Sequence, residues 1–129
     1  MADVNRGNRP LSPHLQVYKL PIMAVTSILT RVTGHALVAG ILLLVWWLVA
    51  AISGEGAFAV ANWVMTSWLG FLIMLGSVWA LWYHTLAGIR HLFYDAGHLL
   101  ELDMARKASW AIVIGSGVLT LLTLLIFFI

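Results

Sequence analysis

Three long stretches without a charged side chain constrain this chain more than any other feature. Residues 32–54, 56–89 and 108–129 contain no Asp, Glu, Lys or Arg, and together they make up 79 of the 129 residues. An α-helix needs about 20 apolar residues to cross a hydrocarbon core of about 30 Å. Only 9% of the chain is charged, against about 25% in a typical soluble domain. The sequence therefore predicts an all-α integral membrane protein with three transmembrane helices.

The breaks between these stretches set the expected helix limits. Pro21 suits the first position of a helix, and the run from Ser53 to Gly56 (Ser-Gly-Glu-Gly) marks a break. The second stretch is expected as one long helix, because 34 charge-free residues are too few for two spans and a turn. The expected helices cover 21–52, 58–92 and 109–128, within a single membrane-anchor domain over 1–129 that leaves no room for a soluble catalytic domain.

The positions of the basic residues predict the orientation. With three spans, all seven fall on one side: Arg6, Arg9, Lys19, Arg31, Arg90, Arg106 and Lys107. The positive-inside rule then places the N-terminus in the cytoplasm and the C-terminus outside, and the 53–62 loop is expected outside as well. Residues 1–13 show no apolar core before a cleavage site, so we expect no secretory signal and a bacterial inner membrane as the location.

Charge balance and cysteine content exclude several classes of function. The net charge is +2, which is too small for nucleic acid to be the main partner. There is no cysteine, which excludes disulfides and thiolate-held clusters within the chain. Small residues instead form stripes suited to helix packing: Ser109, Ser116, Thr120 and Thr123 in the third span, and Gly76, Ala80, Ala87 and Gly88 in the second. They indicate packing within the chain or against a second membrane subunit.

His84 is the strongest candidate for chemistry. It lies six residues before Arg90, hence about 9 Å along a helix from the expected cytoplasmic boundary. An ionisable side chain within a span is costly and suggests function, and imidazole is a common ligand of haem iron. Gly88, one turn further on, would leave space for a flat ring. Spacing alone leaves open a haem ligand or a histidine that hydrogen-bonds a carbonyl of a neighbouring helix.

Two further groups of polar residues flank the apolar stretches. Ser27 and Arg31 are one helical turn apart and suit an oxygen-rich ligand such as a carboxylate or a quinone carbonyl, unless Arg31 extends to lipid phosphate. His35 lies one turn deeper and suits helix packing better than a second haem ligand. His91 and Asp95 share the stripe of His84, which suits a proton path, a cofactor-edge contact or simple solvation at the headgroups.

Two long motifs give the chain a family resemblance. The motifs are Ser27-x-x-Thr30-Arg31-x-Thr33-Gly34 and His84-x-x-x-Gly88-Ile89-Arg90-His91-Leu92-x-Tyr94-Asp95-x-Gly97, preceded by Arg9-Pro10-Leu11. At these residues the sequence resembles the cytochrome b membrane-anchor subunit of succinate dehydrogenase (respiratory complex II), over nearly the whole chain. One position departs from the pattern: the family usually has His where this chain has Thr30.

The resemblance implies a role in electron transport and the tricarboxylic acid cycle. His84 would be one axial ligand of a haem b, with the other histidine supplied by a second small anchor subunit. Ser27 and Arg31 would help form the ubiquinone pocket, and Arg31 would also neutralise a haem propionate. His91 would lie at the haem edge and Asp95 would relay protons. The partners would be the second anchor, the iron–sulfur subunit and the flavoprotein subunit, which passes electrons from succinate.

Other functions fit part of the pattern. The anchor of a quinol:fumarate reductase would run the reverse reaction, and the sequence does not set the direction. A haem-free structural anchor would hold soluble subunits without redox chemistry. A small transporter or channel component should show charges or broken helices at mid-membrane, whereas the centres of these spans carry no charge.

Overall fold

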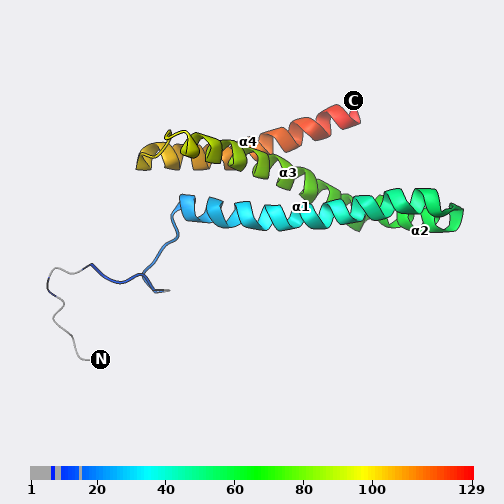
Figure 1. The fold of residues 1–129 in the computed structure, drawn as a ribbon, viewed down its shortest axis with the longest axis horizontal. Coiled ribbons are helices and arrows are strands. Elements are labelled where there is room, and N and C mark those ends of the chain that lie inside the picture. The colour runs from blue at the N-terminus through cyan, green and yellow to red at the C-terminus, as the bar shows by residue number, and fades with distance from the viewer. Residues whose placement is uncertain (1–6, 8–9, 15) are drawn as a thin grey trace.

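A computed structural model describes residues 7, 10–14 and 16–129, and in that part of the chain the regular structure is entirely α-helical (Figure 1). The helices are α1 (Ile22–Ser53), α2 (Glu55–Thr66), α3 (Trp68–Asp95) and α4 (Leu102–Phe128). Three of them, α1, α3 and α4, are long and apolar enough to cross a membrane. The prediction of an all-α membrane protein with three spans is therefore confirmed.

The prediction of one uninterrupted helix over 58–92 is wrong, because the helix breaks at Ser67. The backbone of Ser67 is extended, and its hydroxyl oxygen accepts a hydrogen bond from the Gly70 N–H at 3.1 Å, which is the geometry of a helix N-cap. A Cβ on Gly70 would collide with the carbonyl oxygens of Val64 and Met65. We expected a break to be marked by several turn-forming residues. Here one serine cap and one glycine are enough to end one helix and begin the next.

The loop expected over 53–62 is also largely helical. Gly54 joins α1 to α2 with φ of 124°, a value that side chains other than glycine rarely adopt. The chain reverses there, so α2 folds back along the end of α1. The rings of Trp47 and Phe58 lie 5.8 Å apart between the two helices, and Ala61 is fully buried. The single break at Gly54 therefore produces a tight helical hairpin.

The connection from α3 to α4 is equally compact. The His98 N–H bonds the Phe93 carbonyl at 2.8 Å, and the Gly97 N–H bonds the Tyr94 carbonyl at 2.9 Å. With φ of 77° at Gly97, these two bonds form a Schellman motif that ends α3. The glycine at the end of the second motif therefore has a structural role. The next helix begins at Leu102, seven residues before the expected start at 109, so its first turns carry charged side chains.

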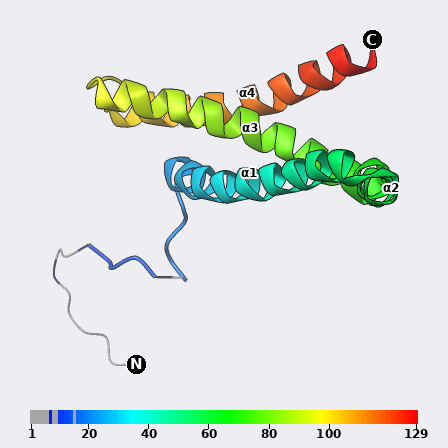
Figure 2. The ribbon, with the colours of Figure 1, turned by 45° about the vertical axis from the view of Figure 1, so that its right-hand side comes forward.

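The three long helices pack loosely, and their interior is more polar than their exterior. In both ribbon views α4 runs back beside α3 and then diverges toward the C-terminus (Figures 1 and 2). In the most apolar window of each span only 6–17% of residues are buried inside the chain. Fully buried side chains include Thr26, Thr33, Ser109 and Ser116, and the apolar core centres on Tyr83, Ala87 and Ile112.

The small polar stripe of the last span packs within the chain. Ser109, Ser116 and Thr120 are buried between the helices. The hydroxyl of Thr123 accepts a hydrogen bond from the Trp82 indole N–H at 2.9 Å. Helices in lipid associate through such small residues and hydrogen bonds because the surrounding hydrocarbon is as apolar as their side chains. The exposed apolar faces of these helices must therefore contact lipid or other subunits.

Candidate functional site

The imidazole of His84 projects from α3 onto the first third of α1. Its Nδ1 lies 3.1 Å from the carbonyl oxygen of Thr30 and 3.3 Å from the hydroxyl of Thr33. A carbonyl oxygen can only accept, so Nδ1 carries a proton, and the neutral form of the ring then has its lone pair on Nε2. The hydrogen bond that the sequence offered as an alternative to ligation is therefore present. It also leaves the other ring nitrogen in the form that binds a metal.

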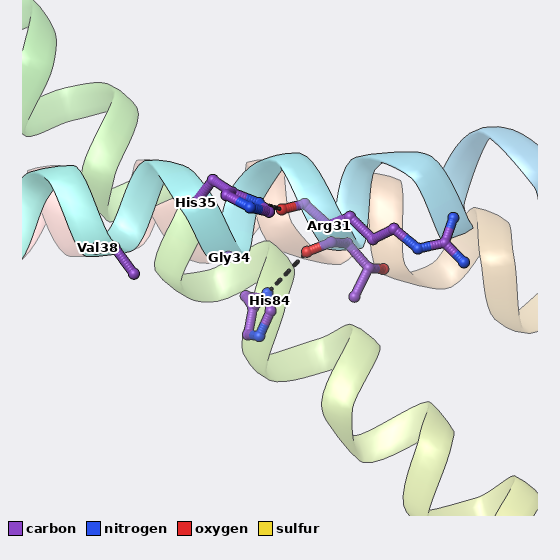
Figure 3. A pocket seen from close by; sticks show the side chains of 6 residues that line it. Arg31, Gly34, His35, Val38 and His84 are labelled. Carbon is purple, nitrogen blue, oxygen red and sulfur yellow. Dashed lines mark hydrogen bonds between the residues drawn. The ribbon is translucent and has the colours of Figure 1, made fainter.

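Beside this ring is an open hollow of about 370 Å³ (Figure 3). The residues that line it are Thr30, Arg31, Gly34, His35, Val38 and His84. Figure 3 shows His84 below α1, with Val38 pointing to the same side, and Arg31 extending toward the start of the helix. The hollow thus combines imidazole side chains, an exposed cation and an apolar wall, which suits a flat apolar group that carries an anionic edge.

A glycine makes the close approach of His84 to α1 possible. A Cβ on Gly34 would lie 3.2 Å from Cε1 of the imidazole, closer than an ordinary contact of about 3.5–4.0 Å. Gly88, which we expected to leave room for a flat ring, has no atom within 4 Å of the position of a Cβ. The glycine against the imidazole is therefore Gly34 of the first motif, and Gly88 borders open space.

The residues predicted from the first motif are brought together only in part. Arg31 is exposed and lines the hollow, while Ser27 lies one turn earlier on α1, outside the lining set. His35 is exposed and also lines the hollow, with its Nδ1 donating to the Arg31 carbonyl at 2.8 Å. His35 therefore does not pack against another helix of this chain, and its packing against a helix of a second subunit stays a prediction. The Arg31 carbonyl orients the His35 ring by a hydrogen bond, as the Thr30 carbonyl orients the ring of His84.

His91 and Asp95 do not belong to the hollow. His91 is exposed, and its ring stacks edge-on against Tyr94 at 5.9 Å. Asp95 is the last residue of α3 and is exposed. A proton relay at Asp95 and a haem-edge contact at His91 stay predictions. Arg9, the first residue of the short motif before the spans, lies outside the described residues.

Sequence reasoning missed a buried polar junction next to the hollow. Arg90 was counted as a charge at the membrane boundary, but its side chain is only 5% exposed. It donates hydrogen bonds to the hydroxyls of Thr26 on α1 and Ser109 on α4. The Tyr83 hydroxyl donates to the Thr26 carbonyl at 3.1 Å. The spacing of Tyr83, Ala87 and Arg90 at i, i+4 and i+7 was the available signal, since it puts the arginine on the buried face.

A metal site made by this chain alone is not found in the part that the structure describes. There, no group of three or more His, Asp or Glu side chains is arranged to hold an ion. The fold and the hollow define the class of the protein: it is a small membrane protein with three apolar helices and an open site that two histidines and an arginine line.

The chain is similar to known proteins over nearly its whole length. A family model of the succinate dehydrogenase/fumarate reductase transmembrane subunit matches residues 5–123. The succinate dehydrogenase cytochrome b556 subunit of Paracoccus denitrificans is 69% identical over 129 residues, which are 100% of this chain and 99% of the relative. The subunit of the same name from Rickettsia conorii is 36% identical over 116 residues, 90% of each chain. The cytochrome b560 subunit of Reclinomonas americana is 33% identical over 126 residues, 93% of this chain and 87% of the relative.

The chain therefore belongs to the family of succinate dehydrogenase/fumarate reductase transmembrane subunits, and within it to the succinate dehydrogenase cytochrome b type. The resemblance of its two motifs to this family is confirmed. With three apolar helices and bacterial relatives, it is a multi-pass protein of the bacterial inner membrane and a membrane subunit of the succinate dehydrogenase complex.

Proposed function

We propose that His84 is an axial ligand of a haem b that occupies the hollow between α1 and α3. The observation that carries this proposal is the bond from Nδ1 to the Thr30 carbonyl, which leaves Nε2 free as a ligand. The space at Gly34 supports it, because no side chain there pushes the ring aside. When bound, the haem would supply a one-electron carrier between the soluble subunits and quinone.

A second axial histidine would come from a second small anchor subunit. The hollow is open rather than enclosed, and the apolar faces of the spans are largely exposed. Both features support a second membrane subunit as the cover. Arg31 lines the hollow with an exposed guanidinium, which suits a propionate carboxylate because its donors match a planar oxyanion.

Ser27 and Arg31 would hold ubiquinone for reduction. Quinone reduction takes two electrons and two protons, so the site must hold a carbonyl oxygen and stabilise the negative charge that develops on it. Arg31 offers a permanent positive charge with several donors, and Ser27 offers a hydroxyl one turn away. The iron–sulfur subunit and the second anchor would complete this pocket, and the flavoprotein would oxidise succinate.

The proposed orientation rests on the positions of the basic residues. With the N-terminus in the cytoplasm and the C-terminus outside, Ser27, Arg31 and His84 lie in the cytoplasmic half of the membrane. Soluble electron-donating subunits would dock on that side. A fumarate reductase anchor would share this geometry, and the direction of the reaction would depend on the potentials of the partner centres and the quinone.

Two measurements on the purified complex test the proposal. His84→Leu removes both ring nitrogens, so we expect the bis-histidine haem spectrum to disappear, while His98→Gln in the exposed α3–α4 connection should leave it unchanged. Ser27→Ala and Arg31→Ala should lower succinate:ubiquinone activity by about tenfold or more, with succinate-to-dye activity retained. An unchanged haem spectrum in His84→Leu would refute the ligand assignment. Equal loss of both activities would indicate failed assembly instead of a damaged quinone site.

A further inference from the structure

The guanidinium of Arg90 is the buried ionisable group that the proposed haem and quinone roles leave unused. Its Nη1 donates to the Thr26 hydroxyl at 2.9 Å and to the Ser109 hydroxyl at 3.0 Å. The guanidinium carbon also lies 5.7 Å from the centre of the Tyr94 ring. One side chain of α3 therefore holds α1 and α4 at a single level of the bundle.

Within the residues that the structure describes, the positive charge of Arg90 forms no ion pair with a carboxylate. Across residues 7, 10–14 and 16–129 the ion pair that forms is Arg106 with Asp103, at the exposed start of α4. The Nε of Arg90 is buried and lacks a hydrogen-bond partner within the same residues. Removing an unpaired cation from water is costly, and two hydroxyls and one ring offset that cost poorly. An ionisable side chain kept at such a cost indicates a use for its charge.

The charge is held close to the ring of His84. Thr26, which contacts Arg90, lies four residues before Thr30 on α1, a rise of about 6 Å. The Thr30 carbonyl is the group that accepts the hydrogen bond from His84. The Tyr83 hydroxyl bonds the Thr26 carbonyl, so the residue next to His84 is fixed to the same turn. A buried charge is screened little by salt, so it acts at this distance.

We propose that Arg90 is a fixed positive charge that stabilises the electron arriving in the His84 hollow, and that Thr26 and Ser109 are positioning residues for it. This inference rests on the proposed haem role of His84. A haem held there would accept one electron when Fe(III) is reduced to Fe(II), and the iron–sulfur subunit would be the donor. At an effective dielectric constant of about 20, a unit charge about 10–15 Å away changes this equilibrium by about 6- to 16-fold.

The test is a redox titration of the haem in the whole purified complex, with dithionite as reductant and mediator dyes. Arg90→Gln keeps an amide that can donate to Thr26 and Ser109 but removes the charge. We expect the ratio of reduced to oxidised haem at a fixed ambient potential to fall by about 6- to 16-fold. Arg90→Lys keeps the charge, and its ratio should stay within about threefold of the wild type.

Two controls separate charge from packing. Arg106→Gln removes an exposed arginine that already pairs with Asp103, so the ratio should not change. Tyr83→Phe removes a buried hydroxyl next to His84 without changing any charge, and it should alter the ratio less than Arg90→Gln does. Equal shifts in Arg90→Gln and Arg90→Lys would show that geometry and not charge is responsible, and would overturn the proposal.

A failure of Arg90→Gln to assemble would not end the test. The double variant Thr26→Val with Ser109→Ala keeps the arginine but removes both hydroxyls that hold it. A fall in the reduced fraction would support the proposal, and a ratio equal to that of the wild type would overturn it. A wild-type complex without haem would refute the haem role itself. The optical spectrum of the wild-type complex shows this before any variant is titrated.

Discussion

Replacing Gly34 should disturb haem binding without destabilising the protein. A Cβ at this position would lie 3.2 Å from Cε1 of His84, so the ring must retreat by a few tenths of an ångström. The bond from Nδ1 to the Thr30 carbonyl is already 3.1 Å long, near the upper limit of about 3.2 Å for N–H···O bonds. The retreat therefore weakens the contact that orients the ring.

The two effects of Gly34→Ala on stability nearly cancel. Losing a hydrogen bond costs about 1 kcal/mol, and replacing a glycine within a helix by alanine contributes about 1 kcal/mol. The loss of haem affinity is not offset in this way, because the imidazole loses the hydrogen-bond partner that orients it. Changes to such partners typically reduce metal affinity about 10- to 100-fold. We expect Gly34→Ala to reduce haem affinity by an amount near the lower limit of this range. Gly34→Val, with two further methyl groups, should reduce it by an amount near the upper limit.

The measurement is haem retention by the purified complex in competition with apomyoglobin, read with the optical spectrum. Gly76→Ala is the matched control, because Gly76 is also a helical glycine, lies on the same helix as His84 and has no atom within 4 Å of its Cβ position. It should raise thermal stability slightly and leave haem retention unchanged. An assembled Gly34→Val complex that retained haem as the wild type does would refute the reasoning.

Substitutions at three further positions test the elements that position the site. Gly70→Ala should lower the stability of the complex by several kcal/mol, since its Cβ would meet the backbone carbonyl of Met65; thermal unfolding within about 1 kcal/mol of the wild type would contradict this. Gly97→Ala should cost about 1 kcal/mol, because alanine is strained at φ of 77°, and limited proteolysis of the α3–α4 connection should accelerate. Thr123→Val leaves the Trp82 N–H unpaired and should cost about 1–3 kcal/mol in thermal unfolding, whereas Thr123→Ser should retain the bond and most of the stability.

The fold class and the number of spans follow from the sequence because the bilayer imposes a length and a composition on each span. The limits of α1 were predicted to within one residue, since Pro21 and Gly54 mark them chemically. The break at Ser67 was not predicted, because one serine cap and one glycine fit within an apolar stretch without altering its composition. The early start of α4 was missed for a similar reason, since its first turns are charged and lie before the apolar stretch.

The sequence by itself determined that this chain crosses a membrane, because a charged side chain in lipid is costly at any position. It also indicated His84, Ser27 and Arg31 as candidates for the chemistry, which stays a prediction. Only the tertiary structure decided how these residues are arranged. It put Gly34 against His84, brought His35 into the hollow and left Ser27 beside it. It also turned Arg90 from a boundary charge into a buried cation. Contacts between α1 and α3 join residues more than 50 positions apart, and no local pattern encodes such a meeting.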